Sequence, residues 1–219
     1  MILSALPGYA QQTAISSFPL FIQHSNSSKP VILFLTGDGG MTSFSKELAN
    51  QLYKEDFSII TLDTRKYFWK AKSPEQFGKD ASQILNYYLS LWNKTSFSVV
   101  GYSFGADVGT FLPAQIGEKL KEDLKKLILL SPGISTDLET KVSNLLSISY
   151  ERDAKFKIYP ELQKLRLPVT CIFGRDEEAA IKQNIKTSSY IQKKEVPGGH
   201  KYNEDVSGIA KLIIQEVSN

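Results

Sequence analysis

The sequence predicts an α/β fold in which a mostly parallel sheet is covered by helices on both faces. Five short apolar runs rich in β-branched residues, each closed by Gly, Pro or Asp, carry this prediction; they span residues 31–35, 58–62, 96–100, 127–130 and 169–173. Such runs are typical of strands buried on both faces of a parallel sheet. Longer segments with apolar residues at helical spacing lie between them, so strands and helices alternate along the chain.

The same patterns predict the remaining elements. Residues 16–23 form an expected edge strand ahead of the first apolar run, and residues 191–196 form an expected last strand. Residues 134–165 break the alternation with mixed polar and short apolar pieces, and they predict a small helical excursion where a cap over a site would lie. The helical segments are expected at 44–52, 77–89, 105–124 and 206–217.

Length and composition indicate one domain with a continuous core. The chain has 219 residues, 42% of them hydrophobic, and we expect a single domain over residues 15–219. The net charge of +3 is too small to indicate a nucleic-acid surface. Cys171 lies inside an apolar run, where a packing role is far commoner than a disulfide or a thiol nucleophile.

Residues 1–14 form an apolar stub followed by Pro-Gly, which resembles the end of a secretory signal peptide without its basic start. They are interpreted either as the remnant of a signal peptide or as a disordered leader. We therefore expect a periplasmic or secreted protein, with a cytoplasmic location as the alternative. No other segment approaches the ~18 continuous apolar residues needed to span a bilayer.

A candidate nucleophile lies where the third apolar run meets a helical segment. Gly101-Tyr102-Ser103-Phe104-Gly105 is a G-x-S-x-G pattern in the strand-to-helix context of the nucleophile elbow of the α/β-hydrolase fold. Glycines flank the elbow because side chains there would collide with the neighbouring strand and helix. An ordinary Gly/Ser turn is the alternative, but the context favours Ser103 as nucleophile.

A serine nucleophile needs a base, and the sequence holds two histidines. His24 precedes the main sheet, whereas His200 follows the last strand, where the order Ser, acid, His places the base. The acid is expected just after residues 169–173. Asp176 is the shorter and commoner choice, whereas Glu177 is three residues after the strand-ending glycine; both are kept as candidates, with Asp176 slightly ahead.

The oxyanion donors are expected to be two backbone N–H groups, one from Phe104 after the nucleophile and one from Asp38 in the Gly-rich loop 36–40. That loop lacks the Lys-Ser/Thr of a phosphate-binding loop. The carboxylate of Asp38 either receives a substrate ammonium group or caps the helix near Thr42 or bonds its own loop. Asp107 is expected to make a buried structural bond.

A basic aromatic segment follows the second apolar run. Arg65, Lys66, Tyr67 and Trp69 would suit an anionic amphipathic substrate such as a phospholipid headgroup, because loops at the carboxyl ends of strands line the ligand crevice. The alternative is aromatic packing beneath a solvated basic loop. The set of substrate-binding candidates is completed by Gly37, Asp38 and Tyr102.

Several of these motifs resemble the bacterial virulence protein family of VirJ and the C-terminal domain of AcvB. The resemblance covers most of residues 20–215 and implies a periplasmic hydrolase of the α/β-hydrolase fold, with lysyl-phosphatidylglycerol as the associated substrate. It rests on Thr36-Gly37-Asp38-Gly39-Gly40, Arg65-Lys66-Tyr67-Phe68-Trp69 with Ser73-Pro74-Glu75-Gln76, Gly101-Tyr102-Ser103-Phe104-Gly105-Ala106-Asp107-Val108 and Pro197-Gly198-Gly199-His200.

Together these patterns predict a serine esterase that works through an acyl-enzyme, with no metal and no organic cofactor. The expected partner is a small-molecule or lipid ester, such as an aminoacyl phospholipid at a membrane surface, and no nucleic acid. A small-ester or thioester hydrolase is a second possibility. From another class, a non-catalytic binding or secretion-accessory protein would keep the scaffold without using it.

Overall fold

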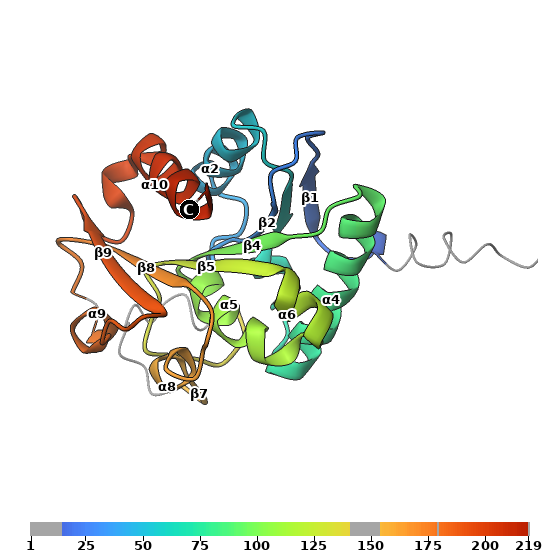
Figure 1. Cartoon of the computed structure of the whole chain (residues 1–219). Coiled ribbons are helices and arrows are strands. Elements are labelled where there is room, and N and C mark those ends of the chain that lie inside the picture. The colour runs from blue at the N-terminus through green and yellow to red at the C-terminus, as the bar shows by residue number, and fades with distance from the viewer. Residues whose placement is uncertain (1–14, 141–153, 179, 219) are drawn as a thin grey trace, which may run out of the picture.

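The computed structural model describes residues 15–140, 154–178 and 180–218, so the predicted leader at 1–14 lies outside the described residues. A seven-stranded sheet has the order β1-β3-β2-β4-β5-β8-β9 and is parallel except for β1, which runs antiparallel to β3 (Figure 1). The predicted α/β class is confirmed. The strands are β1 Leu20–Gln23, β2 Val31–Leu35, β3 Ile59–Leu62, β4 Phe97–Tyr102, β5 Leu124–Leu130, β8 Val169–Gly174 and β9 Ile191–Val196.

Helices cover both faces of the sheet (Figure 1). On one face lie α2 and α10, and on the other lie α4, α5, α6 and α8. The bounds are α2 Ser43–Lys54, α3 Thr64–Tyr67, α4 Pro74–Leu91, α5 Phe104–Gln115, α6 Glu118–Asp123, α8 Ile158–Leu162, α9 Ala180–Asn184 and α10 Val206–Ser218.

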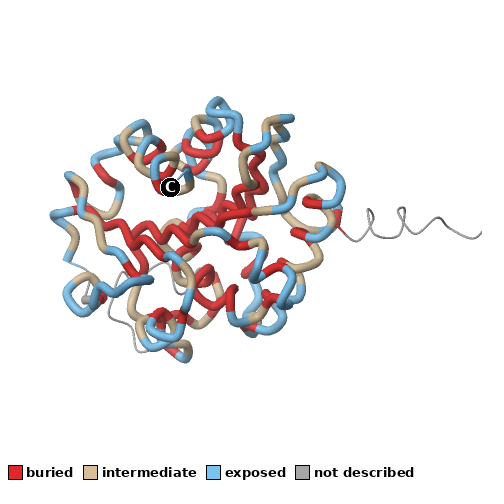
Figure 2. Tube along the Cα trace, in the orientation of Figure 1, coloured by how far each residue is buried: buried red, intermediate tan, exposed pale blue. Residues whose placement is uncertain are grey.

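The strands β2, β3 and β8 are buried along their whole length (Figure 2). Since successive side chains of a strand point to opposite faces, Leu33 packs into the core under α4 and α5 and Phe34 packs into the core under α2 and α10. This double burial explains why the strands are continuous apolar runs without polar alternation.

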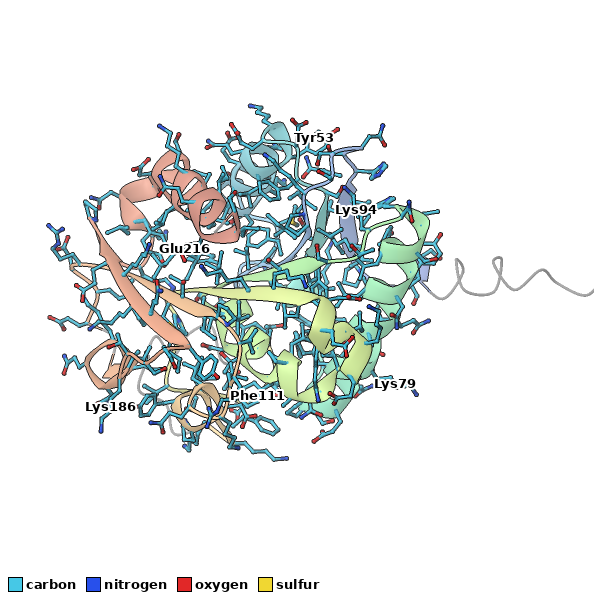
Figure 3. The ribbon with its side chains drawn as sticks, viewed as in Figure 1. Tyr53, Lys79, Lys94, Phe111, Lys186 and Glu216 are labelled. Carbon is cyan, nitrogen blue, oxygen red and sulfur yellow. The ribbon has the colours of Figure 1, made fainter. Side chains whose placement is uncertain are left out.

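Ion pairs and a hydrogen bond to the buried Glu216, which Figure 3 labels, hold α10 against the sheet. The Glu216 carboxylate accepts a bond from the Thr170 hydroxyl at 2.6 Å and pairs with Lys126 at 2.7 Å and with Lys194. Burial alone raises the pKa of Glu216, but these bonds outweigh it and lower the pKa to about 2.

Two predicted elements have different limits in the structure. The edge strand begins at Leu20, because Ile15 and Ser16 are helical and a turn ending at Pro19 precedes the strand. The helical segment 105–124 is two helices, α5 and α6, since Ile116 and Gly117 are both extended and α6 begins at Glu118.

The excursion at 134–165 contains the short helix α8, as the sequence predicts, and also a two-stranded antiparallel ribbon. The ribbon pairs β6 (Ser135–Thr136) with β7 (Phe156–Lys157). Residues 141–153 of this excursion lie outside the described residues. Within the described ranges, no helix combines the length and the apolar character needed to cross a membrane.

Candidate active site

Ser103 lies at a strained turn between β4 and α5, with φ 53° and ψ −120°. Two glycines make this turn sterically feasible. A Cβ on Gly101 would lie 2.4 Å from the Gly105 carbonyl oxygen, and a Cβ on Gly105 would lie 2.1 Å from the Leu35 carbonyl oxygen. The Ser103 N–H donates to the Leu130 carbonyl at 2.8 Å, which fixes the turn against β5. The geometry is that of a nucleophile elbow.

His200 brings its ring to this serine from the loop after β9. Its Nε2 lies 2.9 Å from Ser103 Oγ. Gly198, with φ +95°, allows the chain to turn back, and the Tyr102 hydroxyl donates to the His200 carbonyl at 3.3 Å. The loop also packs against Gly174, where a Cβ would lie 2.2 Å from the Gly199 carbonyl oxygen.

Of the two carboxylates considered as the acid, the structure places Glu177 against the imidazole. Glu177 Oε1 lies 2.6 Å from His200 Nδ1. Asp176 is exposed in the turn after β8, and its backbone N–H donates to the Gly198 carbonyl at 3.0 Å. Asp176 therefore helps to hold the histidine loop through its backbone, whereas Glu177 contacts the ring.

The second oxygen of Glu177 is held by two further donors. Oε2 accepts bonds from the Ser131 hydroxyl at 2.7 Å and from the Gly174 N–H at 3.2 Å. Burial raises the pKa of Glu177, but the hydrogen bonds from His200, Ser131 and Gly174 outweigh it, so the pKa lies below the ordinary value. The carboxylate is thus ionised and oriented at neutral pH.

Ser131 and Tyr202 form a supporting layer that the sequence analysis missed. Ser131 is buried at the end of β5 with φ 50°, and its hydroxyl lies 2.5 Å from the Tyr202 hydroxyl. Tyr202 is buried and bonds the Ile172 carbonyl at 3.1 Å. Their positions in the sequence could have identified them, since Ser131 directly follows a buried strand and Tyr202 is two residues after His200.

The two residues expected to supply the oxyanion donors, Phe104 and Asp38, line the same cavity as Ser103. Phe104 is the first residue of α5, so its N–H has no acceptor within the helix. In the Gly-rich loop, the Gly37 carbonyl accepts bonds from Gly40 N–H and Thr64 Oγ1, both at 2.9 Å. Because the peptide is trans, the Asp38 N–H points the opposite way, away from Thr64.

A cavity of about 940 Å³ opens beside Ser103 and His200. Its walls come from the Gly-rich loop, including Gly37, from Tyr102, from the start of α2 and from the excursion, where Ser135 to Thr140 contribute one side. Among the described lining residues, carboxylates outnumber the basic side chains His200 and Lys201; the acidic residues are Asp38, Glu47, Asp107, Asp137, Glu139 and Glu204. The lining favours a cationic ligand group over an anionic one.

Asp107 lies four residues after Ser103, on the same face of α5, and lines the cavity. Its Oδ1 accepts the Gly133 N–H at 2.6 Å, so the expected structural bond is present. Removal from water raises the pKa of Asp107 to about 8, and the nearby charge of Asp38 adds to this rise. The cap of α2 is Thr42, whose hydroxyl accepts the Ser45 N–H at 3.2 Å, so Asp38 does not cap that helix.

A second, basic groove of about 690 Å³ adjoins the cavity and shares Gly39 with it. The exposed side chains of Arg65, Lys66 and Trp69 line this groove. Tyr67 belongs instead to the core, where it is 7% exposed and its hydroxyl donates to Asp80 at 2.6 Å. Of the substrate-binding candidates in this segment, Tyr67 is therefore the one that lines neither the cavity nor the groove, because its ring packs in the core.

The described residues contain no cluster of three or more His, Cys, Asp or Glu side chains arranged to hold a metal ion. Cys171 is fully buried in β8, and burial raises the pKa of its thiol to about 12. The predicted packing role of this cysteine is confirmed.

Solved structures with a similar fold are known for several enzymes. The enol-lactonase from Burkholderia xenovorans LB400 has a TM-score of 0.68 at 14% identity, covering 94% of this chain and 99% of that chain. An esterase from Exiguobacterium antarcticum has a TM-score of 0.62 at 12% identity, covering 91% and 95%. The thioesterase domain from the curacin biosynthetic pathway has a TM-score of 0.61 at 15% identity, covering 89% and 94%. These likenesses show the α/β-hydrolase fold.

Among curated proteins, none matches the sequence. The family model of the bacterial virulence protein VirJ matches residues 29–219, a range that includes the elbow serine, the histidine and the glutamate described above. This match agrees with the resemblance carried by the sequence motifs, and the chain belongs to the VirJ family of bacterial virulence proteins.

Proposed function

We propose that this chain is a serine esterase that works through an acyl-enzyme, with Ser103, His200 and Glu177 as its catalytic triad. The observation that carries the proposal is the continuous chain of contacts from Ser103 Oγ to His200 Nε2 at 2.9 Å and from His200 Nδ1 to Glu177 at 2.6 Å. Nucleophile, base and orienting carboxylate are thus within hydrogen-bond reach of one another, as this chemistry requires.

In the proposed acylation step, His200 Nε2 takes the Ser103 proton while Oγ attacks the ester carbonyl. The developing oxyanion is bound by the N–H groups of Phe104 and Asp38, which are fixed before the reaction begins. The tetrahedral intermediate then collapses, and the proton on His200 passes to the departing alcohol. In the second half of the reaction, His200 takes a proton from a water molecule that attacks the acyl-enzyme, and this proton passes to Ser103 Oγ as the carboxylic acid leaves.

Glu177 supports both halves of this cycle. Its carboxylate accepts a hydrogen bond from the Nδ1–H group, which keeps Nε2 free to act as the base, and its negative charge stabilises the imidazolium that forms. The bonds from Ser131 and Gly174 hold the carboxylate in place and ionised. Ser131 and Gly174, together with Tyr202 behind Ser131, therefore act as positioning residues and do not touch the reacting atoms.

For the substrate we propose an aminoacyl-phospholipid ester such as lysyl-phosphatidylglycerol. Two features of the described residues support this class. The carboxylates of the cavity, including Asp38 and Asp137, suit an ammonium group on the acyl side of the ester, and Arg65 and Lys66 of the adjoining groove suit a phosphate on the alcohol side. Since both sites share Gly39, one extended molecule with both charges can occupy them together.

The test is hydrolysis of lysyl-phosphatidylglycerol and of a neutral short-chain ester by the purified chain, beside Ser103→Ala. Ser43→Ala, on the wall of the same cavity, is the matched control and should keep activity. Cleavage of the aminoacyl lipid by the wild type but not by Ser103→Ala supports both parts of the proposal. Cleavage of the neutral ester alone keeps the esterase and rejects the substrate. Failure on both substrates, with Ser103 also unreactive, favours a non-catalytic binding protein.

A further inference from the structure

The groove beside the cavity exposes large aromatic side chains among cations. Five residues that line it are here called the interfacial patch: Phe21, Lys46, Arg65, Lys66 and Trp69. Phe21 is 43% exposed and Trp69 is 46% exposed, although aromatic side chains of this size are normally covered in the fold. A surface that keeps two such rings in water gains free energy when another surface covers them.

The exposure of these two rings follows from the local structure. Phe21 lies on β1, the first strand in the sheet order, whose outer edge pairs with none of the described strands. Trp69 lies two residues after the end of α3, and the two residues before it, Tyr67 and Phe68, fill the core at 7% and 0% exposure. Of three consecutive aromatics, the third is thus directed outward, and core packing does not account for it.

The charge of the patch is positive. Lys46, Arg65 and Lys66 are exposed along the groove. Among the described residues lining the groove, Asp63 is the one carboxylate; it is buried, accepts the Lys66 N–H as the cap of α3, and lies 3.8 Å from Lys66 Nζ. Asp63 offsets part of the charge of Lys66, and the lining still holds three cations against this one carboxylate, which suits a partner carrying negative charge.

The combination of aromatics and cations fits a membrane surface better than it fits a nucleic acid. Trp sits at the headgroup level of bilayers, and Lys and Arg near an anionic bilayer each contribute about 1 kcal/mol of attraction. The net charge of the chain, +3, is too small to indicate a nucleic-acid surface.

We propose that the interfacial patch docks the protein on an anionic lipid bilayer, with the mouth of the cavity facing the headgroups. This inference rests on the proposed function in one respect, because a phospholipid ester would reach Ser103 from that surface. Docking itself needs neither turnover nor a triad, so the two can be tested apart.

The experiment is co-sedimentation of the full chain with vesicles of phosphatidylcholine alone and of phosphatidylcholine mixed with phosphatidylserine. Phosphatidylserine supplies negative charge without being a product of the proposed reaction. We expect binding to the anionic vesicles at low salt, weak binding to the neutral ones, and release as salt screens the cations. No binding to the anionic vesicles overturns the proposal.

The patch variant is Phe21→Ala with Lys46→Gln, which removes one aromatic ring and one cation. Its matched control is Tyr53→Ala with Lys125→Gln (Figure 3 labels Tyr53). Tyr53 is 40% exposed at the end of α2 and Lys125 is exposed at the start of β5, both near the amino ends of the parallel strands, whereas Arg65, Lys66 and Trp69 follow the carboxyl end of β3. Removing one cation alone weakens binding about 5-fold, so the patch variant should lose roughly 10-fold or more, and the control should stay within about 2-fold. Equal losses in both variants overturn the proposal.

Two further readouts separate docking from catalysis. Trp69→Ala should weaken vesicle binding several-fold, and unchanged binding in this variant overturns the proposal. The Phe21→Ala, Lys46→Gln variant should hydrolyse a water-soluble neutral ester at the wild-type rate, because neither residue lies at the catalytic groups. Vesicle binding by a chain that hydrolyses no ester supports the docking proposal and rejects the proposed function. Ester hydrolysis without vesicle binding supports the proposed function and rejects the docking proposal.

Discussion

The carboxylate of Glu177 lies 2.6 Å from Nδ1 of His200, while the adjacent Asp176 faces solvent and uses its backbone to hold the histidine loop. The strand β8 ends at Gly174, and a tight turn over the next residues brings the third residue after that glycine back toward the ring. The longer glutamate side chain then spans the distance to the imidazole and still reaches the Ser131 hydroxyl with its second oxygen.

Glu177→Ala should reduce kcat by about 10³- to 10⁴-fold, the scale seen when the acid of a serine triad is removed. Asp176→Ala is the matched control, one residue away, and should stay within about 3-fold of the wild type because its side chain is exposed. Steady-state kinetics on one ester measure both variants. A large loss in Asp176→Ala together with a small loss in Glu177→Ala would reverse the assignment.

Ser131→Ala should lower kcat by roughly 10- to 100-fold, because one hydrogen bond to the charged Glu177 is lost. The same loss raises the pKa of Glu177, since Ser131 is one of the groups that lower it, and the acid limb of the pH profile of kcat should move to higher pH. If Ser131 had only a structural role, its replacement would leave the acid limb of the pH profile of kcat at the same pH. Tyr202→Phe, which keeps the bond between Ser131 and Glu177, should change the unfolding free energy by about 1 kcal/mol with little effect on the limb.

Gly105→Ala should destabilise the fold by at least about 3 kcal/mol, because the new methyl group would lie 2.1 Å from the backbone oxygen of Leu35, which cannot move without disturbing β2. Gly117→Ala is the control, since nothing lies within 4 Å of the added carbon, and it should change stability by no more than about 0.5 kcal/mol. Urea unfolding followed by circular dichroism measures both. Equal midpoints for the two variants would show that the elbow does not need its glycine.

Asp107→Asn should remove part of the pH dependence of stability. With its pKa raised from 3.8 to about 8, Asp107 keeps a proton in the folded chain that the unfolded chain has released, so the free energy of unfolding falls as the pH rises through this window. The variant should therefore gain stability over the wild type with rising pH, by an amount on the order of a few kcal/mol above pH ~8. Asp176→Asn, which changes an exposed carboxylate, should give a curve parallel to the wild type, and a parallel curve for Asp107→Asn would contradict the account.

Much of the fold could be predicted because strands that are buried on both faces of the sheet need continuous apolar runs, which are visible in the sequence. The runs at 31–35 and 169–173 coincide with β2 and β8 to within one residue. The limits of weaker elements could not be predicted, since the chain before Leu20 and the break at Ile116 depend on turns and packing rather than on a hydrophobic period.

The site was predictable where a motif ties chemistry to a turn, as at Ser103 and His200. The choice between the adjacent Asp176 and Glu177 was not predictable, because the turn after β8 decides which of the two carboxylates reaches the imidazole. Tyr67 shows a second limit: the sequence marks three aromatics in a row without saying which of them the core needs. The acidic lining from the excursion, such as Asp137 and Glu139, arises from tertiary placement that no local pattern records.

The central claim is that Ser103 is an activated nucleophile, and fluorophosphonate labelling of the intact chain followed by peptide mass mapping tests it most directly. The account predicts one covalent adduct on Ser103, formed much more slowly in Glu177→Ala and absent in Ser103→Ala, with Ser43→Ala labelled like the wild type. No adduct on the wild type, or an adduct on another serine at an equal rate, would contradict it.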